Sequence, residues 1–397
     1  MTKKLLFAHD DRVSFDPAGR PVSYNYTRRL VDRYRHLADE VTFAVRCLAQ
    51  EPVPWFSDAT VACIPDVKHG LGMTRYYTAR RAVERLVDRH DLVVARLPSL
   101  MGSWALRQAW RTRKPVLVEF VGCPWDALWN HSALGKFLAP FFFLKNRFLM
   151  RRSEYTVYVT GTFLQERYPS AGASIACSNV EIVPVSRPIL AQRLERMQEG
   201  AFAENCTLAT VAALDVPYKG QHLVIEALGY LRDAGLKPRY RLIGGGDPFR
   251  LERLAARLGV RDQVEFLGPL PHAQVLEALD SVDIYLQPSR QEGLPRALIE
   301  AMSRGCAALG SGAGGISELL DPACIVKPLS PLAIAAAIQG KGPDFWAGQA
   351  ERNWVVSHDY TFEGLDARRK GFYDRFLREN ADRLDRKCMN NTDAATE

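Results

Sequence analysis

The chain lacks any apolar run of the roughly 18 residues that a membrane-spanning helix needs. Residues 1–8 (MTKKLLFA) resemble the start of a secretion signal, but His9 and Asp10 end the apolar run at once. We therefore expect a first buried strand here rather than a secretion signal.

Cysteine pairs and metal-ligand clusters are missing as well. The eight cysteines, at positions 47, 63, 123, 177, 206, 306, 324 and 388, form no CxxC pair, and none lies near a histidine at metal-ligand spacing. This pattern argues against a zinc site and predicts free thiols in a reducing cytoplasm. We expect no metal and no other cofactor. Helix-turn-helix, zinc-finger and aromatic–basic RNA motifs are also absent, which argues against nucleic acid as a partner.

Acidic charge is scarce in the first half of the chain. Residues 1–190 hold 27 Lys/Arg against 17 Asp/Glu, a balance of +10, whereas the remainder holds 25 against 28, a balance of −3. With nucleic acid disfavoured, this asymmetry indicates an anionic membrane surface or a phosphorylated substrate.

The 397 residues suffice for two domains, and the apolar pattern repeats accordingly. Candidate strands fall at 4–8, 41–45, 92–95, 116–120, 156–159 and 180–183, and again at 208–212, 240–243, 264–267, 282–286, 306–309 and 324–326. Helical patterns lie between them, including one in the polar linker at 190–197. Repeated βα units predict an α/β protein with two Rossmann-like, doubly wound parallel-sheet domains that face each other across a cleft.

The most informative segment runs from Glu292 to Glu300 (EGLPRALIE). Gly293 permits a tight backbone path, and Pro295 suits the first turn of a helix that continues to Arg304. Free N–H groups at the start of this helix can bind an anion such as a diphosphate. One carboxylate can bind hydroxyls of a sugar and the other a ribose diol. Taken alone, two glutamates at this spacing are more often simply solvated.

The surroundings of this segment strengthen the functional interpretation. A second apolar strand and the run Gly314-Gly315-Ile316-Ser317-Glu318 follow it. A Glu-x7-Glu loop and helix followed by Gly-Gly-x-x-Glu strongly resembles the nucleotide-sugar site of the family 4 retaining glycosyltransferases, among the group 1 glycosyltransferases. The resemblance is close over 205–330 and looser before 190.

The resemblance implies the GT-B fold and a division of labour between its domains. Residues 1–188 would form an N-terminal acceptor-binding domain and residues 200–361 a nucleotide-sugar-binding domain. A last helix at about 362–385 would cross back to the first domain, and 386–397 would be a disordered tail.

The resemblance also implies roles for residues of the second domain. Lys219 would pair with the donor diphosphate and stabilise the charge that the leaving group gains. Glu292 would hold the sugar, and Glu300 would bind the ribose. Lys219 and Glu292 are therefore the catalytic candidates. The other donor-binding candidates lie at strand ends or around the Glu292 loop: Gly244, Gly245, Leu267, Leu270, Arg290, Gly293, Leu294, Pro295 and Arg296.

The chain departs from the family pattern in three places. Ala213 stands where many members carry an arginine, and Arg290 or Arg296 could replace that cation. The usual Gly-Gly turn after the first strand is reduced to Gly19, and no histidine follows the strand at 116–120. The acceptor-binding candidates in the first domain are His9, Gly19, Glu119 and Asp126. A structural role is the commoner expectation for His9 and equally common for the two carboxylates.

Residues 133–152 combine a dense aromatic and aliphatic run with Lys145, Arg147, Arg151 and Arg152. This composition suits an interfacial segment on an anionic membrane. A core helix with basic ends is the alternative. A lipid-pyrophosphate acceptor would explain both this segment and the basic first half.

The sequence thus predicts a metal-independent retaining glycosyltransferase of the hexosyltransferase type. It would move a sugar from a nucleotide-sugar donor to a glycan or lipid-linked acceptor hydroxyl during cell-surface polysaccharide or glycolipid assembly. We expect it in the cytoplasm, peripheral to the inner face of the cell membrane. The alternatives are a nucleotide-sugar epimerase of the same fold and a non-catalytic, degenerate transferase that serves as a binding subunit.

Overall fold

The computed structural model describes residues 2–16, 20–22, 27–47, 53–56, 59–65, 73–183, 187–198 and 206–384. Gly19 and the expected tail at 386–397 lie outside the described residues.

The N-terminal domain is built on an eight-stranded sheet of order β10-β9-β8-β7-β1-β4-β6-β5, in which β5 alone is antiparallel to its neighbour. Its strands are β1 (Lys4–Arg12), β4 (Glu40–Arg46), β5 (Val53–Phe56), β6 (Ala59–Ile64), β7 (Leu92–Leu97), β8 (Val116–Phe120), β9 (Tyr155–Tyr158) and β10 (Ala173–Ala176). A short hairpin of β2 (Ser14–Phe15) and β3 (Pro21–Val22) follows β1. The helices are α1 (Arg28–Arg35), α2 (Met73–Arg89), α3 (Leu100–Arg111), α4 (Pro124–Trp129), α5 (Ala133–Met150) and α6 (Phe163–Arg167).

The C-terminal domain is built on a six-stranded parallel sheet of order β13-β12-β11-β14-β15-β16. Its strands are β11 (Thr207–Val211), β12 (Arg239–Ile243), β13 (Val264–Gly268), β14 (Ile284–Gln287), β15 (Ala307–Ser311) and β16 (Ile325–Val326). The flanking helices are α9 (Gln221–Asp233), α10 (Phe249–Arg257), α11 (His272–Asp280), α12 (Arg296–Ser303), α13 (Ile316–Leu319), α14 (Pro331–Gln339) and α15 (Pro343–Ser357), and η1 (Pro217–Lys219) is a 3-10 turn. The strand order reverses between β11 and β14, where open parallel sheets form their ligand crevices.

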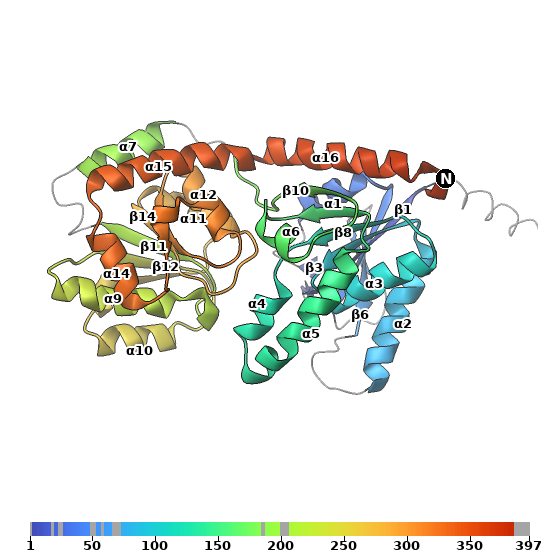
Figure 1. The fold of residues 1–397 in the computed structure, drawn as a ribbon, viewed down its shortest axis with the longest axis horizontal. Helices are drawn as coiled ribbons and strands as arrows, with labels where there is room; N and C mark the ends of the chain where they lie inside the picture. Colours follow the sequence, from blue (N-terminus) through green and yellow to red (C-terminus); the bar gives the residue numbers. More distant parts are fainter. Residues whose placement is uncertain are drawn as a thin grey trace, which may run out of the picture.

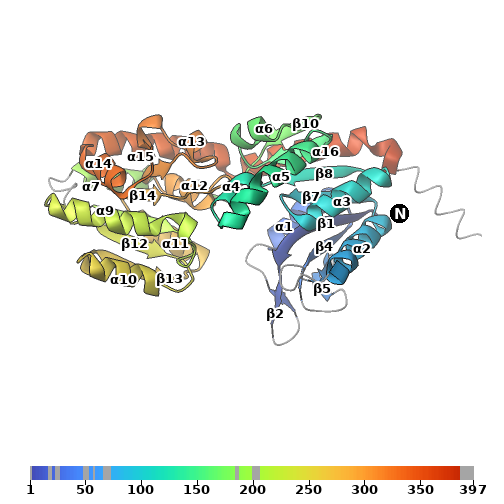
Figure 2. The ribbon, with the colours of Figure 1, turned by 60° about the horizontal axis from the view of Figure 1, so that its bottom comes forward.

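Two further helices tie the domains together (Figures 1 and 2). The helix expected in the linker, α7 (Arg187–Gln198), packs on the second domain, where the guanidinium of fully buried Arg193 donates 2.7–2.8 Å hydrogen bonds to the carbonyls of Leu279 and Val282. The last long helix, α16 (Phe362–Glu379), runs back along the first domain, as Figure 1 shows. Arg369 on α16 donates a 2.7 Å hydrogen bond to the carbonyl of Ser178.

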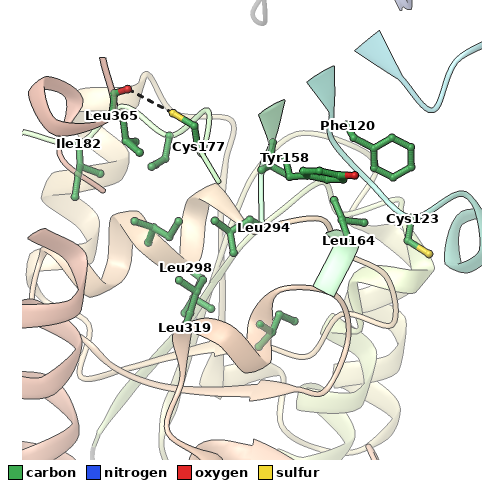
Figure 3. Packing of buried hydrophobic residues seen from close by; sticks show 14 of the residues in the cluster. Phe120, Cys123, Tyr158, Leu164, Cys177, Ile182, Leu294, Leu298, Leu319 and Leu365 are labelled. Atoms are coloured by element: carbon green, nitrogen blue, oxygen red, sulfur yellow. Dashed lines mark hydrogen bonds between the residues drawn. The ribbon is translucent and has the colours of Figure 1, made fainter. Parts of the chain in front are cut away.

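Buried apolar side chains form one continuous cluster through both domains. Figure 3 shows its part at the domain junction, with Leu294 and Leu298 of the second domain and Tyr158 and Leu164 of the first. Burial of this apolar surface stabilises the contact between the two domains, by about 25 cal/mol per Å² of apolar area.

Two expectations from the sequence are wrong. The apolar run at 180–183 forms no strand, since the chain leaves the sheet there and only a single bridge joins Ile182 to Thr361. Cys47 and Cys63 are not free thiols. They form a disulfide with a Cα–Cα distance of 5.1 Å, because β4 and β6 are adjacent parallel strands that bring the two positions together.

Candidate active site

The two catalytic candidates, Lys219 and Glu292, meet at the switch point of the second sheet. Lys219 ends the η1 turn that follows β11, and Glu292 lies in the loop between β14 and α12. The ammonium of Lys219 lies 2.7 Å from Oε1 of Glu292. Both side chains are largely buried, so this ion pair is poorly screened by solvent.

A chain of buried polar groups holds Glu292 in place. Gln287, at the end of β14, donates a 3.0 Å hydrogen bond from Nε2 to the same Oε1. The hydroxyl of Tyr285 in turn donates to the Gln287 side chain at 3.1 Å. Gln287 is 2% exposed and Tyr285 is fully buried, so neither can reorient without losing its partner.

The pair faces a cavity of about 710 Å³ between the domains. The second domain contributes the lining residues Val211, Lys219, His272, Gln287, Glu292, Gly293, Leu294, Pro295, Arg296, Ala297 and Glu300. The first contributes His9, Asp11, Thr27, Leu30, Arg33, Arg96, Val121, Val159, Ser178, Asn179 and Glu181. His9 and Asp11 belong to β1 and Arg96 to β7, so the cavity also meets the switch point of the first sheet.

The backbone of the Glu292 loop is pressed against both domains. A Cβ on Gly293 would lie 2.5 Å from the carbonyl oxygen of Val121 in the first domain. Gly314 adopts a φ of +57°, and a Cβ there would lie 2.3 Å from the carbonyl oxygen of Glu292. Its neighbour Gly315 donates a 2.7 Å hydrogen bond to the carbonyl of Gly293. The two glycines of the Gly-Gly-x-x-Glu run therefore pack directly against the backbone of the Glu292 loop.

The second glutamate of the motif has a histidine beside it. Oε1 of Glu300, on α12, lies 3.4 Å from Nε2 of His272, the first residue of α11. This contact with Glu300 raises the pKa of His272 above its ordinary value, although partial burial acts in the opposite direction. Both side chains line the same cavity as the Lys219–Glu292 pair.

Several predicted donor-binding residues lie elsewhere. Arg296 lines the main cavity, but Arg290 lines a separate groove together with Arg167 and Lys327. The predicted residues Gly244, Gly245, Leu267 and Leu270 are not among those that line the main cavity. The amide of Leu214 donates a 2.8 Å hydrogen bond to the carbonyl of Gly245, which joins the loop after β11 to the loop after β12.

The two carboxylates that the sequence predicted to bind the acceptor are both engaged in ion pairs and do not line the main cavity. Glu119 is 2% exposed, accepts hydrogen bonds from Arg96 at 2.7 Å and from Tyr34 at 2.8 Å, and thus holds β8, β7 and α1 together. Burial alone would raise its pKa, but the charges of Arg96, Arg33 and Arg369 outweigh burial and hold the pKa below its ordinary value. Asp126 accepts a hydrogen bond from Arg167 at 3.1 Å and lines the separate groove.

Sequence reasoning missed three residues that shape the site. Gln287 could have been found as a polar side chain at the carboxyl end of a parallel strand at the switch point. His272 and Arg96 carried no sequence signal, since each becomes part of the cavity only through the packing of the domains. The described residues contain no group of three or more His, Cys, Asp or Glu side chains placed to share a metal ion.

Two Rossmann-like domains with a lysine–glutamate pair at the switch point, facing each other across a cavity, define the GT-B class of fold. Comparison with solved structures agrees: the crystal structure of Anabaena Alr3699/HepE in complex with UDP-glucose superposes with a TM-score of 0.64 at 16% identity, over 94% of this chain and 99% of that one. Residues 192–340, which include most of the second domain, match the family model of the glycosyl transferases group 1.

Curated relatives match over parts of their length. Protein CapJ of Staphylococcus aureus is 28% identical over 246 residues, which cover 61% of this chain and 60% of CapJ. The putative colanic acid biosynthesis glycosyltransferase WcaL of Escherichia coli (strain K12) is 38% identical over 111 residues, 26% of this chain and 27% of WcaL. The chain therefore spans less than two thirds of the length of each.

Proposed function

We propose that the protein is a retaining, metal-independent glycosyltransferase of the hexosyltransferase type, of family 4, that moves a sugar from a nucleotide-sugar donor to an acceptor hydroxyl. The observation that carries this proposal is the Lys219–Glu292 ion pair at the switch point, open to a cavity large enough for a donor.

The chemistry follows from the charges of this pair. When the bond between the anomeric carbon and the diphosphate breaks, the leaving diphosphate gains negative charge. The ammonium of Lys219 stabilises that charge, and the amides at the start of α12 add to it. The carboxylate of Glu292 stabilises the positive charge that develops on the sugar ring. The acceptor hydroxyl attacks on the face that the diphosphate leaves, and its proton passes to a phosphate oxygen.

The remaining residues bind and orient the donor. Glu300 would accept hydrogen bonds from the ribose hydroxyls, and the amides of Gly293 and Leu294 would bind the sugar. Arg296 is the candidate for the second cation on the diphosphate, in place of the arginine that Ala213 replaces, since it lines the same cavity whereas Arg290 does not. Backbone groups around Gly244 and Leu267 would meet the base.

The acceptor would enter from the first domain, where His9 and Arg33 line the cavity. The name of WcaL refers to colanic acid biosynthesis, and this supports assembly of a cell-surface polysaccharide or glycolipid as the pathway. We place the enzyme in the cytoplasm, at the inner face of the cell membrane, with a glycan or lipid-linked acceptor. In the described part of the chain, no helix is both long and apolar enough to cross a bilayer.

A donor screen tests this proposal. UDP-, GDP-, ADP-, CMP- and dTDP-sugars are scored by thermal stabilisation and by slow release of free nucleotide, beginning with UDP-glucose. Glu292→Ala should abolish release, while Glu277→Ala, an exposed position on α11, should leave it unchanged. Activity that survives a metal chelator and a product of unchanged anomeric configuration complete the assignment. An epimerised donor, or no turnover of any sugar, would overturn it.

A further inference from the structure

Helix α5 carries a stripe of exposed apolar side chains. Leu134, Phe137, Phe141, Leu144 and Phe148 are 67%, 80%, 64%, 64% and 53% exposed. Their spacing of three, four, three and four residues places them on one face of the helix. Large apolar side chains scattered over a surface are ordinary, but five on one line of one helix form a contiguous patch that marks a binding face.

Basic side chains flank this stripe on both sides. At 100° per residue, Lys136 and Arg147 fall on one side of it, and Lys145 and Arg152 on the other. Each has an aromatic ring beneath its charge. Lys136 lies over Trp129, Lys145 over Phe142 and Arg147 over Phe143, with the charged group 5.4–5.8 Å from the ring centroid. The apolar stems are therefore used in packing, while the charges of Lys136 and Arg152 stay exposed and that of Arg147 is half-exposed. Lys145 is more enclosed, and burial lowers the pKa of its ammonium.

Acidic residues are absent from the whole segment. Residues 127–153 contain five Lys/Arg and no Asp or Glu. A second copy docking through the same stripe would bring these like charges together, which disfavours a dimer through this face. An anionic surface would instead neutralise them. Charge thus selects the occupant: an anionic lipid headgroup layer, with the apolar stripe reaching the acyl boundary.

The position of α5 relates this face to the site. Helices α4 and α5 pack closely on each other and project together from the first domain toward the second (Figure 1). Asn130, at the end of α4, donates a 3.1 Å hydrogen bond to the carbonyl of Arg290, two residues before Glu292. The N-terminal end of α5 therefore lies close to the loop that carries Glu292.

We propose that α5 docks flat on an anionic lipid membrane through the Leu134–Phe148 stripe, with its basic flanks on the headgroups. This proposal deepens and rests on the proposed function, because it names the surface that brings a lipid-linked acceptor to the cleft. A stripe that enters the headgroup region gives affinity through apolar burial, and the flanking cations give preference for anionic lipid.

Vesicle flotation of the full chain tests the proposal. The wild type should float with phosphatidylcholine vesicles that contain phosphatidylglycerol and remain at the bottom with pure phosphatidylcholine. The double variant Phe137→Glu/Phe141→Glu should lower binding at least tenfold, as should Arg147→Glu/Arg152→Glu. The control is Phe249→Glu on α10, which replaces another exposed phenylalanine (58%), in the second domain, and should bind like the wild type.

The outcomes separate docking from catalysis. Release of nucleotide from a soluble donor should be the same in the wild type and in the α5 variants, so loss of flotation with intact release supports membrane docking. Equal binding to neutral vesicles would overturn the role of the basic flanks. A wild type that ignores vesicles but forms a dimer in solution, split by Phe137→Glu/Phe141→Glu, would show that a second copy covers the stripe and would overturn the proposal.

Discussion

The ammonium of Lys219 and the carboxylate of Glu292 lie 2.7 Å apart although 73 residues separate them in the chain. They come together because one follows β11 and the other follows β14, the two strands on either side of the switch point. In the proposed reaction, the donor diphosphate therefore shares the ammonium with Glu292, whose carboxylate neutralises the largely buried cation.

Replacing Lys219 removes the cation and keeps the Glu292 carboxylate, so it tests what the cation alone contributes. Lys219→Met should lower kcat by about 10²–10³-fold, because a positioned charge on a leaving group acts mainly in the transition state. Lys237→Met, at an exposed turn after α9, is the control and should leave turnover unchanged. Steady-state kinetics with the best donor provide the measurement. A rise in KM with unchanged kcat would show that Lys219 contributes only to ground-state binding.

The close contact between Gly293 and Val121 predicts that a larger side chain at position 293 lowers activity. A methyl group at position 293 would lie 2.5 Å from the Val121 carbonyl oxygen and must push the loop away from the first domain. Gly293→Ala should therefore lower kcat/KM by about tenfold or more, since small displacements of reacting groups are costly. Gly348→Ala on α15 has open space around its Cβ and serves as the control. Full activity of Gly293→Ala would contradict the close fit.

Much of the fold could be predicted from the sequence because parallel strands that are buried on both faces appear as apolar runs. The run at 116–120 is an example, and β8 has those bounds. The short, half-exposed strand β10 gave no such signal. The run at 180–183 is also apolar, but Val180 and Ile182 are buried where the chain enters the linker, Val183 is exposed, and the run does not extend the sheet.

The candidate site was predictable only where a residue lies in a local motif. Glu292 and Glu300 share one loop and helix, so their spacing carries information. Glu119, another carboxylate at a strand end, could not be distinguished from a ligand-binding acid. Its burial depends on Tyr34 from α1 and on Tyr373 from α16, both far away in the sequence. Long-range packing of this kind leaves no local pattern.

The last residue of the Gly-Gly-x-x-Glu run makes a contact between domains. The carboxylate of Glu318 accepts hydrogen bonds from the backbone amides of Gly161, Thr162 and Phe163 at 2.5, 3.1 and 2.6 Å and from the Thr162 hydroxyl at 3.1 Å. These amides precede or begin α6, where they have no partner within the helix. Glu318 thus fixes the distance between the two walls of the cleft.

Loss of this carboxylate should loosen the cleft without touching the donor. Glu318→Gln keeps the size of the side chain but loses its charge, at a cost of about 1–2 kcal/mol for hydrogen bonds of this kind. We expect a larger radius of gyration by small-angle X-ray scattering and a higher KM for donor. Glu277→Gln is the control. An unchanged radius and KM would show that the apolar junction alone holds the domains.

The histidine beside Glu300 predicts a dependence of stability on pH. The contact with Glu300 raises the pKa of His272 above its ordinary value, so the folded state favours the protonated imidazole. Its contribution to the free energy of unfolding is fully present below about pH 6.5, the unfolded value, and is lost as pH rises through the folded pKa. Because the side chain is 58% exposed, solvent screening limits the contribution to about 0–1 kcal/mol.

Thermal unfolding of the wild type and of His272→Gln at two pH values measures this contribution. The wild type should have the higher Tm at about pH 6, and the difference should shrink by about pH 8.5, as the imidazole loses its proton. Glu300→Gln removes the partner, so the same histidine substitution in that background should show no change of the difference with pH. If the Tm difference grows with pH, or if it still shrinks with rising pH in the Glu300→Gln background, the pH dependence does not come from the contact between His272 and Glu300.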